Sequence, residues 1–125
     1  MWDFFTEDEL RCKGTDECNM DQEFMEMLVS LRYAYDKPMV ISSGYRDASY
    51  NQVIGGAKNS PHLFGKAVDV LVSGRDAYEL MSLAMEKGFS GIGISQRGPH
   101  DSRFIHIDTM EDSDTHPRPW VWSYK

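Results

Sequence analysis

Three side chains in this sequence have the types and the spacing of metal ligands. His62 and Asp69 stand seven positions apart in NSPHLFGKAVDV, and His106 stands in the apolar stretch RFIHIDT. A catalytic zinc ion takes three nitrogen or oxygen ligands from a protein and keeps a fourth position for water. A buried carboxylate between valines, as at Asp69, needs a cation or a hydrogen-bond donor beside it. These residues predict a zinc site; the alternative for His106 is a hydrogen-bonded histidine of the core.

The alternation of a β-strand places two of these side chains together. In RFIHIDT, His106 and Asp108 share one face, and Asp69 projects from one face of KAVDVLV. If the two stretches are neighbouring strands, Asp69 and His106 point toward the same place. We expect His62 to reach that place from the loop before its strand. Gly65 would let the chain turn sharply there, or would let a substrate backbone approach closely.

The remaining stretches predict the elements that hold these strands. Hydrophobic spacing and caps indicate helices over 5–10, 20–36, 46–56 and 73–88, with Thr6, Asp21 and Ser73 as N-caps. Strands are expected at 39–43, 66–72, 91–95 and 103–109, and an aromatic edge strand within 117–125. The predicted fold class is α+β: one domain over 1–125 with a small, mostly antiparallel sheet and helices packed on one face.

Composition excludes several classes of function. The 125 residues carry a net charge of −7, which argues against a nucleic-acid partner because phosphate binding needs a basic surface. No stretch is apolar enough to insert in a membrane. The start MWDFFTEDEL is not a signal peptide, so we expect synthesis in the cytoplasm. Cys12 and Cys18 are expected to be free thiols, although one local disulfide stays an alternative.

Longer motifs around the candidate ligands resemble a known family. SPHLFGKAVDV has the form Ser-x-His-x-x-Gly-x-Ala-x-Asp, FIHID supplies His-x-Asp, and SSGYR stands upstream of both. Together they resemble the zinc D-alanyl-D-alanine carboxypeptidases. Relatives of that family are the L-alanyl-D-glutamate endopeptidases of bacteriophage lysins and the hedgehog signalling domain. The resemblance covers nearly the whole chain.

The resemblance implies a role for each matching residue. It makes His62, Asp69 and His106 the zinc ligands, and Arg46 the arginine that contacts a substrate carbonyl or carboxylate. Within the same motifs, Ser60 is expected to hydrogen-bond inside the site. Three further expectations concern neighbouring positions: Tyr45 contacts substrate, Asp108 orients His106, and His116, which matches no motif, lies on the surface.

The general base is the point where the chain departs from the family pattern. Several family members carry a Glu, Asp or His a few residues before the third ligand, but Arg103 occupies the position three residues before His106. Asp101 and His100 stand five and six residues before it, in GPHDSRF. We predict that one of them is the base, with Asp101 preferred. The alternative is that both are ordinary polar residues of a loop.

The resemblance implies a zinc peptidase that hydrolyses amide bonds in the peptide stem of bacterial peptidoglycan. Either D-Ala-D-Ala carboxypeptidase or L-Ala-D-Glu endopeptidase activity is compatible with the motif. A one-domain phage lysin, monomeric and acting on the cell wall or in the periplasm, is the preferred context; a bacterial wall-remodelling enzyme is the second. The alternative from another class is a non-catalytic zinc-containing module that binds the cell wall or a protein.

Overall fold

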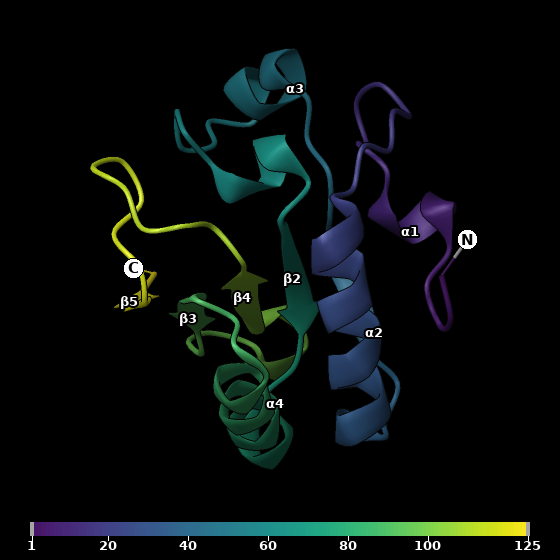
Figure 1. The fold of residues 1–125 in the computed structure, drawn as a ribbon, viewed down its shortest axis with the longest axis vertical. Coiled ribbons are helices and arrows are strands. Elements are labelled where there is room, and N and C mark those ends of the chain that lie inside the picture. Colours follow the sequence, from purple (N-terminus) through teal and green to yellow (C-terminus); the bar gives the residue numbers. More distant parts are fainter. Residues whose placement is uncertain (1, 125) are drawn as a thin grey trace.

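Two long helices cover one face of a five-stranded sheet (Figure 1). The computed structural model describes residues 2–124. Its elements follow in this order: α1 (Glu7–Leu10), α2 (Gln22–Tyr35), β1 (Val40–Ser43), α3 (Ala48–Val53), the 3-10 helix η1 (Pro61–Phe64), β2 (Ala67–Leu71), α4 (Gly74–Lys87), β3 (Gly91–Ser95), the 3-10 helix η2 (His100–Ser102), β4 (Phe104–Asp108) and β5 (Trp120–Ser123).

Local sequence explains where the helices begin and end. Thr6 and Glu9 form a reciprocal capping box at α1, and the Asp21 carboxylate caps α2. Gly88 ends α4 with a φ of 95°, a left-handed conformation that favours glycine. The caps predicted at Thr6 and Asp21 are confirmed. Ser73 occupies the N-cap position of α4, but its side chain makes no capping hydrogen bond.

The strands form a mixed sheet in the order β1-β2-β4-β3-β5. The first three neighbouring pairs are antiparallel, and β5 joins the edge parallel to β3. The mostly antiparallel α+β fold is therefore confirmed. An edge strand also forms in the aromatic tail, directly after Pro119, whereas Lys125 at its end and Met1 at the start of the chain lie outside the described residues.

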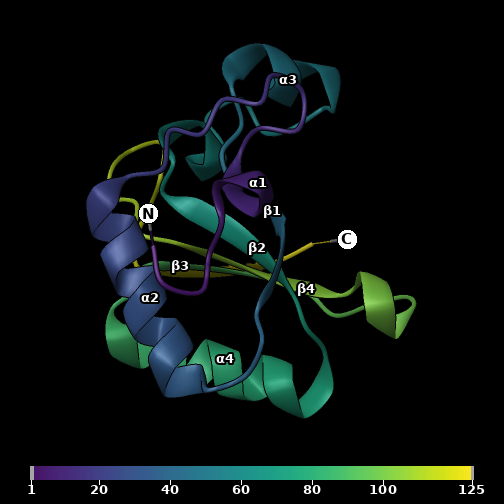
Figure 2. The ribbon, with the colours of Figure 1, turned by 90° about the vertical axis from the view of Figure 1, so that its right-hand side faces the viewer.

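The two faces of the sheet carry different side chains. Val68, Val70, Ile105 and Ile107 point into the apolar core under α2 and α4. Asp69 and His106 alternate with them and point to the opposite face. Figure 2 shows α4 on one side of the sheet and the short α3 on the other. The expectation of helices on one face thus holds for the two long helices only.

The described residues also bear on two expectations from composition. Cys12 is buried and Cys18 half-buried, and both are free thiols. Within residues 2–124, no helix has the length and apolar character needed to cross a membrane.

Candidate metal centre

The three predicted ligands converge on one point above the sheet. Asp69 and His106 lie directly opposite each other in the antiparallel pair β2 and β4. His62 reaches them from η1, the short helix that leads into β2. All three side chains are buried, and one donor atom from each lies within 4.8 Å of the other two. Strand alternation and motif spacing therefore located this cluster correctly.

Gly65 ends η1 and turns the chain into β2, which places His62 beside Asp69. Its φ of 67° lies in the left-handed region, and a Cβ atom there would sit 2.0 Å from the carbonyl oxygen of Asn19. The positive φ and the close approach of Asn19 are both set by the fold and involve no substrate. Of the two reasons expected for this glycine, the sharp turn is the one that the fold uses.

When both histidines are neutral, the hydrogen bonds on their outer nitrogen atoms leave the inner nitrogen atoms without protons. Nδ1 of His62 lies 2.7 Å from the carbonyl oxygen of Gly44, so it carries the proton and donates. Nε2 of His106 lies 2.7 Å from a carboxylate oxygen of Asp108 and donates to it. The lone pairs on His62 Nε2 and His106 Nδ1 then both face Asp69 Oδ1, at 3.3 and 3.1 Å. In the neutral tautomers, three acceptors face one another with no donor between them.

This arrangement fits a small divalent cation with nitrogen and oxygen ligands. Zinc–ligand bonds of about 2.0–2.1 Å in a tetrahedron separate the ligand atoms by about 3.3 Å. The two nitrogen–oxygen distances at Asp69 are close to that separation. A cation in the centre would also remove the repulsion among the three acceptors. The donor set therefore matches a three-ligand zinc site with a fourth position free.

The pKa shifts of the metal-free cluster follow from burial and from the two carboxylates. Burial lowers the pKa of His62 and outweighs its contact with Asp69. Burial also acts to lower the pKa of His106, but the hydrogen bonds to Asp108 and Asp69 outweigh it, so that pKa is raised. Burial disfavours the Asp69 anion, yet the two histidines hold the pKa of this carboxyl well below its usual range. The histidines differ because only His106 contacts a second carboxylate.

Arg46 places a permanent cation beside the cluster. It follows β1, and its Nη2 atom lies 3.7 Å from Asp69 Oδ2. Its Nε donates to the Ser43 hydroxyl at 3.1 Å and its Nη1 to Asn51 Oδ1 at 3.3 Å. The guanidinium group is thereby held in place while 16% of the side chain stays exposed. Arginine offers planar, fixed donors, which suit a carbonyl or carboxylate oxygen of a ligand.

A hydrogen-bonded support behind His106 involves residues that the sequence reasoning did not single out. Asp108 is fully buried and receives two hydrogen bonds from Arg118, at 2.9 and 2.8 Å. The Arg118 guanidinium in turn lies over the Trp122 ring at 5.2 Å, and this ring packs against His106. Asp108 thus occupies the orienting position expected for it, and the tail of the chain holds it there.

Two glycines in GIGIS make room for this support. A Cβ atom at Gly91 would lie 2.3 Å from both carboxylate oxygens of Asp108, and one at Gly93 would lie 2.8 Å from the Trp122 ring. Alternate glycines on one face of a central strand are unusual, because glycine weakens a strand. This pattern was the signal in the sequence that a bulky group covers β3 here.

A cavity of about 400 Å³ opens above the three candidate metal ligands, His62, Asp69 and His106. Its walls come from distant parts of the chain: Arg46, the 55–57 turn, Ser60, Phe104, Trp122 and Tyr124. Burial raises the pKa of the Tyr124 hydroxyl, so this group stays a hydrogen-bond donor at neutral pH. The cavity therefore combines apolar walls with a metal site, one cation and one phenol.

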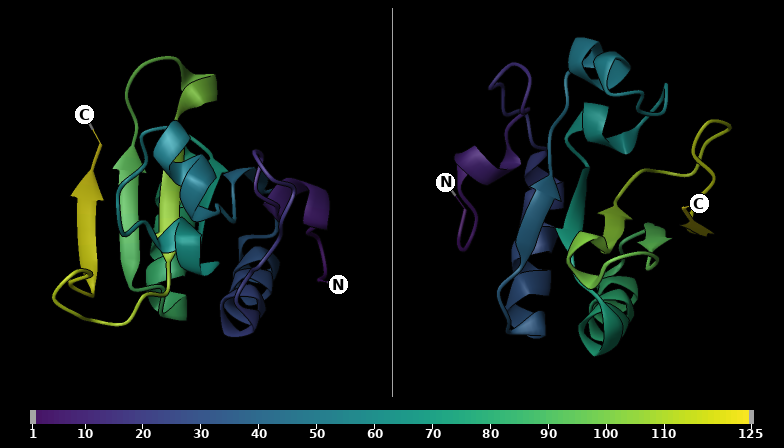
Figure 3. Two further views of the ribbon diagram at one scale, coloured as in Figure 1. Left: turned by 90° about the horizontal axis from the view of Figure 1, so that it is seen from above. Right: turned by 180° about the vertical axis from the view of Figure 1, so that it is seen from behind.

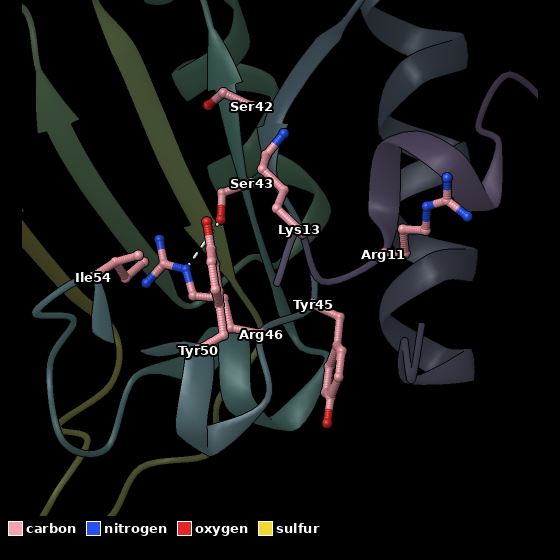
Figure 4. Close-up of a pocket in the computed structure, with 9 residues that line it drawn as sticks. Arg11, Lys13, Ser42, Ser43, Tyr45, Arg46, Tyr50 and Ile54 are labelled. Atoms are coloured by element: carbon pink, nitrogen blue, oxygen red, sulfur yellow. Dashed lines mark hydrogen bonds between the residues drawn. The ribbon is translucent and has the colours of Figure 1, made fainter. Parts of the chain in front are cut away.

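The other residues singled out from the sequence have varied places. Ser60 is buried, lines the cavity and accepts a hydrogen bond from the backbone of His62. Tyr45 lies outside the lining of this cavity, and its side chain points away from Arg46 (Figure 4). His116 is buried rather than exposed, because its Nε2 bonds the carbonyl oxygen of Asn59 at 2.5 Å. The prediction of a surface residue is wrong there.

His100 and Asp101 are not brought to the cavity. Both are exposed residues of η2, and neither belongs to the lining of the metal-site cavity. In Figure 3 this yellow-green turn between β3 and β4 extends beyond the end of the sheet. Their role as base stays a prediction.

Comparison with known proteins agrees with the geometry. The zinc D-Ala-D-Ala carboxypeptidase of Streptomyces albus G is 35% identical over 83 residues, which are 65% of this chain and 32% of that protein. The probable peptidoglycan L,D-endopeptidase MepK of Haemophilus influenzae is 35% identical over 96 residues, which are 73% of this chain and 49% of that protein. This chain thus spans about a third to a half of the length of these relatives.

A family model agrees with both relatives. The model for Peptidase M15 matches residues 3–108, a range that holds all three donors and Asp108. The residues of the tail that support and line the site, Arg118, Trp122 and Tyr124, lie beyond the matched range. The three side chains of the candidate metal centre lie inside this match, and their role as zinc ligands stays a prediction. The expected family is confirmed, and the chain belongs to the Peptidase M15 family.

Proposed function

We propose that this protein is a zinc-dependent peptidase that hydrolyses amide bonds in the peptide stem of bacterial peptidoglycan. The observation that carries the proposal is the convergence of His62 Nε2, His106 Nδ1 and Asp69 Oδ1 at the floor of an open cavity, with Arg46 in its wall. A structural zinc site is closed by four protein ligands, whereas a catalytic one keeps a position open. The two relatives, a zinc carboxypeptidase and a probable peptidoglycan endopeptidase, support both the metal and the substrate.

The residues of the cavity have distinct parts in such a reaction. Zinc supplies Lewis-acid polarisation of the scissile carbonyl and acidifies water at neutral pH. Arg46 presents its guanidinium beside Asp69, where a donor stabilises the negative charge that develops on the carbonyl oxygen. Asp108 keeps His106 in the tautomer whose Nδ1 faces the metal. The apolar walls limit the access of water to these charges.

The assignment of the general base, the residue that accepts the proton of the attacking water, rests on the sequence alone. Asp101, or else His100, remains the proposed base, and either one has to reach the cavity by a movement of η2. The variants Asp101→Asn and His100→Gln separate them, because only the true base loses turnover while both variants keep zinc. Full turnover in both variants would contradict a base in η2.

The proposal leaves open which of two bonds in the stem is cut. A carboxypeptidase releases a terminal D-alanine, and an endopeptidase cuts within the stem. We propose that the protein acts as a monomer at the cell wall, and a phage lysin is one context that fits.

The test is digestion of purified peptidoglycan by the zinc-loaded protein, with products identified by mass spectrometry. A chelated sample and the variant His62→Ala serve as controls. A product that needs both the metal and His62 supports the proposal, and its mass identifies the bond. Firm zinc binding with no product would contradict the proposal and favour a zinc-containing binding module instead.

A further inference from the structure

A second cavity lies next to the metal site and carries the opposite charge balance to the chain. It has a volume of about 200 Å³, and Arg11, Lys13 and Arg46 line it together with Ser42, Ser43 and Tyr50 (Figure 4). None of the residues that line it is acidic. The whole chain has 20 acidic and 13 basic residues, so a pocket with cations alone is unlike its general surface. A local positive potential attracts anions even when the net charge is negative.

Close backbone contacts build this cavity from two separate segments. The backbone N–H of Tyr45 donates to the carbonyl oxygen of Leu10 at 2.8 Å, and a Cβ atom at Gly44 would lie 2.5 Å from that oxygen. Gly14 packs on the ring of Tyr50, where a Cβ atom would lie 2.2 Å from a ring carbon. The segment that carries Lys13 is therefore pressed against the turn that carries Arg46.

The cavity adjoins the metal ligands directly. Arg46 lines both this cavity and the one above the metal site. Gly44 lines the second cavity and accepts the hydrogen bond from His62 through its carbonyl oxygen. Ser43 lies opposite Asp69 in the sheet. Only the Arg46 side chain thus separates a substrate group in this cavity from a bond in the cavity above the metal site.

The three cations differ in how free they are to bind an anion. Arg11 is paired with Asp8 at 3.2 Å and with Asp16 at 3.7 Å. Arg46 already contacts Asp69. Lys13 is exposed and forms no ion pair within residues 2–124. Lys13 is therefore the cation with an unused charge, and Arg46 links it to the reaction site.

We propose that this cavity binds the free α-carboxylate of the stem glutamate when the bond between L-alanine and D-glutamate is the one presented to the metal. The proposal rests on the proposed peptidase function. In the peptidoglycan stem, glutamate is joined to the next residue through its side-chain carboxyl, so its α-carboxylate is either free or amidated. A carboxylate accepts charge-assisted hydrogen bonds from Lys13 and hydroxyl donors, and an amide cannot replace its charge. The cavity thus selects stems with the free acid.

The experiment compares two synthetic stem peptides that differ only at this group, α-carboxylate against α-carboxamide. Cleavage by the zinc-loaded protein and binding to it by calorimetry are both measured, for the wild type, for Lys13→Gln and for the control Lys87→Gln at the far end of α4. We expect the wild type to bind and cleave the acid about five- to tenfold better, since a partly exposed charge contact has a modest effect. Lys13→Gln should lose most of this preference through KM, and Lys87→Gln should keep it.

The two measurements separate failure of this proposal from failure of the proposed function. Cleavage of both peptides at equal rates, or an unchanged preference in Lys13→Gln, would overturn the carboxylate site and leave the peptidase intact. Preferred binding of the acid that depends on Lys13, without cleavage, would support the site and contradict the peptidase. A preference that weakens as salt rises from about 0.05 to 0.5 M is also expected, because salt screens exposed charges.

Discussion

Arg118→Gln removes the support behind His106 without touching a proposed zinc ligand. Arg118 donates two hydrogen bonds to Asp108, whose side chain is fully buried, while only 7% of the Arg118 side chain is exposed. Glutamine is too short to restore both bonds and carries no charge. Asp108 is then left with His106 and the backbone N–H of Met110 as donors.

The size of the effect follows from these contacts. Breaking a buried ion pair by removal of one partner costs about 3–5 kcal/mol. Asp108 keeps two other hydrogen-bond donors in the variant, so we expect a slightly smaller loss, about 2–4 kcal/mol in the free energy of unfolding. Loss of a group that orients a metal ligand weakens metal binding about 10- to 100-fold, and we expect zinc affinity to fall within that range.

Two measurements test the prediction: urea unfolding of the metal-free protein and zinc competition against a chromophoric chelator. Arg103→Gln is the matched control, because this arginine is half-buried and, within residues 2–124, its side chain makes a single hydrogen bond, to the carbonyl oxygen of Gly98. We expect the control to bind zinc as the wild type does. Wild-type zinc affinity in Arg118→Gln would refute the reasoning that the tail orients His106.

Three further predictions concern the cluster itself. His62→Ala and Asp69→Ala should each lose stoichiometric zinc, measured by elemental analysis after dialysis; zinc retained by both would rule out the site. The metal-free protein should be most stable near pH 6.5, about the ordinary pKa of histidine. Below it, the lowered pKa of His62 makes the fold lose stability as pH falls, and above it the stabilisation from the raised pKa of His106 is lost as pH rises. Bound zinc should abolish the decline above pH 6.5 in urea unfolding, and a decline that persists would contradict the assignment. Gly91→Ala should destabilise the protein by about 1–3 kcal/mol through its clash with Asp108, whereas a neutral effect in thermal unfolding would contradict the close packing.

Local patterns were sufficient to predict that His62, Asp69 and His106 converge, and to predict the strands that carry Asp69 and His106. Strand alternation placed Asp69 and His106 on matching faces, and the register then set them directly opposite each other. Capping residues located the first two helices for the same reason: the interaction is complete within a few residues. Apolar alternation also separated the core face of the sheet from the face that carries the site.

Contacts between segments far apart in the chain could not be predicted from local patterns. His116 is buried because it meets a carbonyl group 57 residues earlier in the chain. Arg118 binds Asp108 only because the tail returns along β3 as a parallel strand, and no local pattern specifies that pairing. The exposed position of Asp101 in η2 likewise depends on how the turn between β3 and β4 leaves the sheet.

The central claim is that one zinc ion, held by His62, Asp69 and His106, makes this protein a peptidase. The most direct measurement is cleavage of a stem peptide as zinc is added stepwise to the metal-free protein. The account predicts that activity rises in proportion to bound zinc, stops rising at one equivalent, and stays at zero in His106→Ala. Cleavage without metal, or one tightly bound equivalent without cleavage, would contradict it.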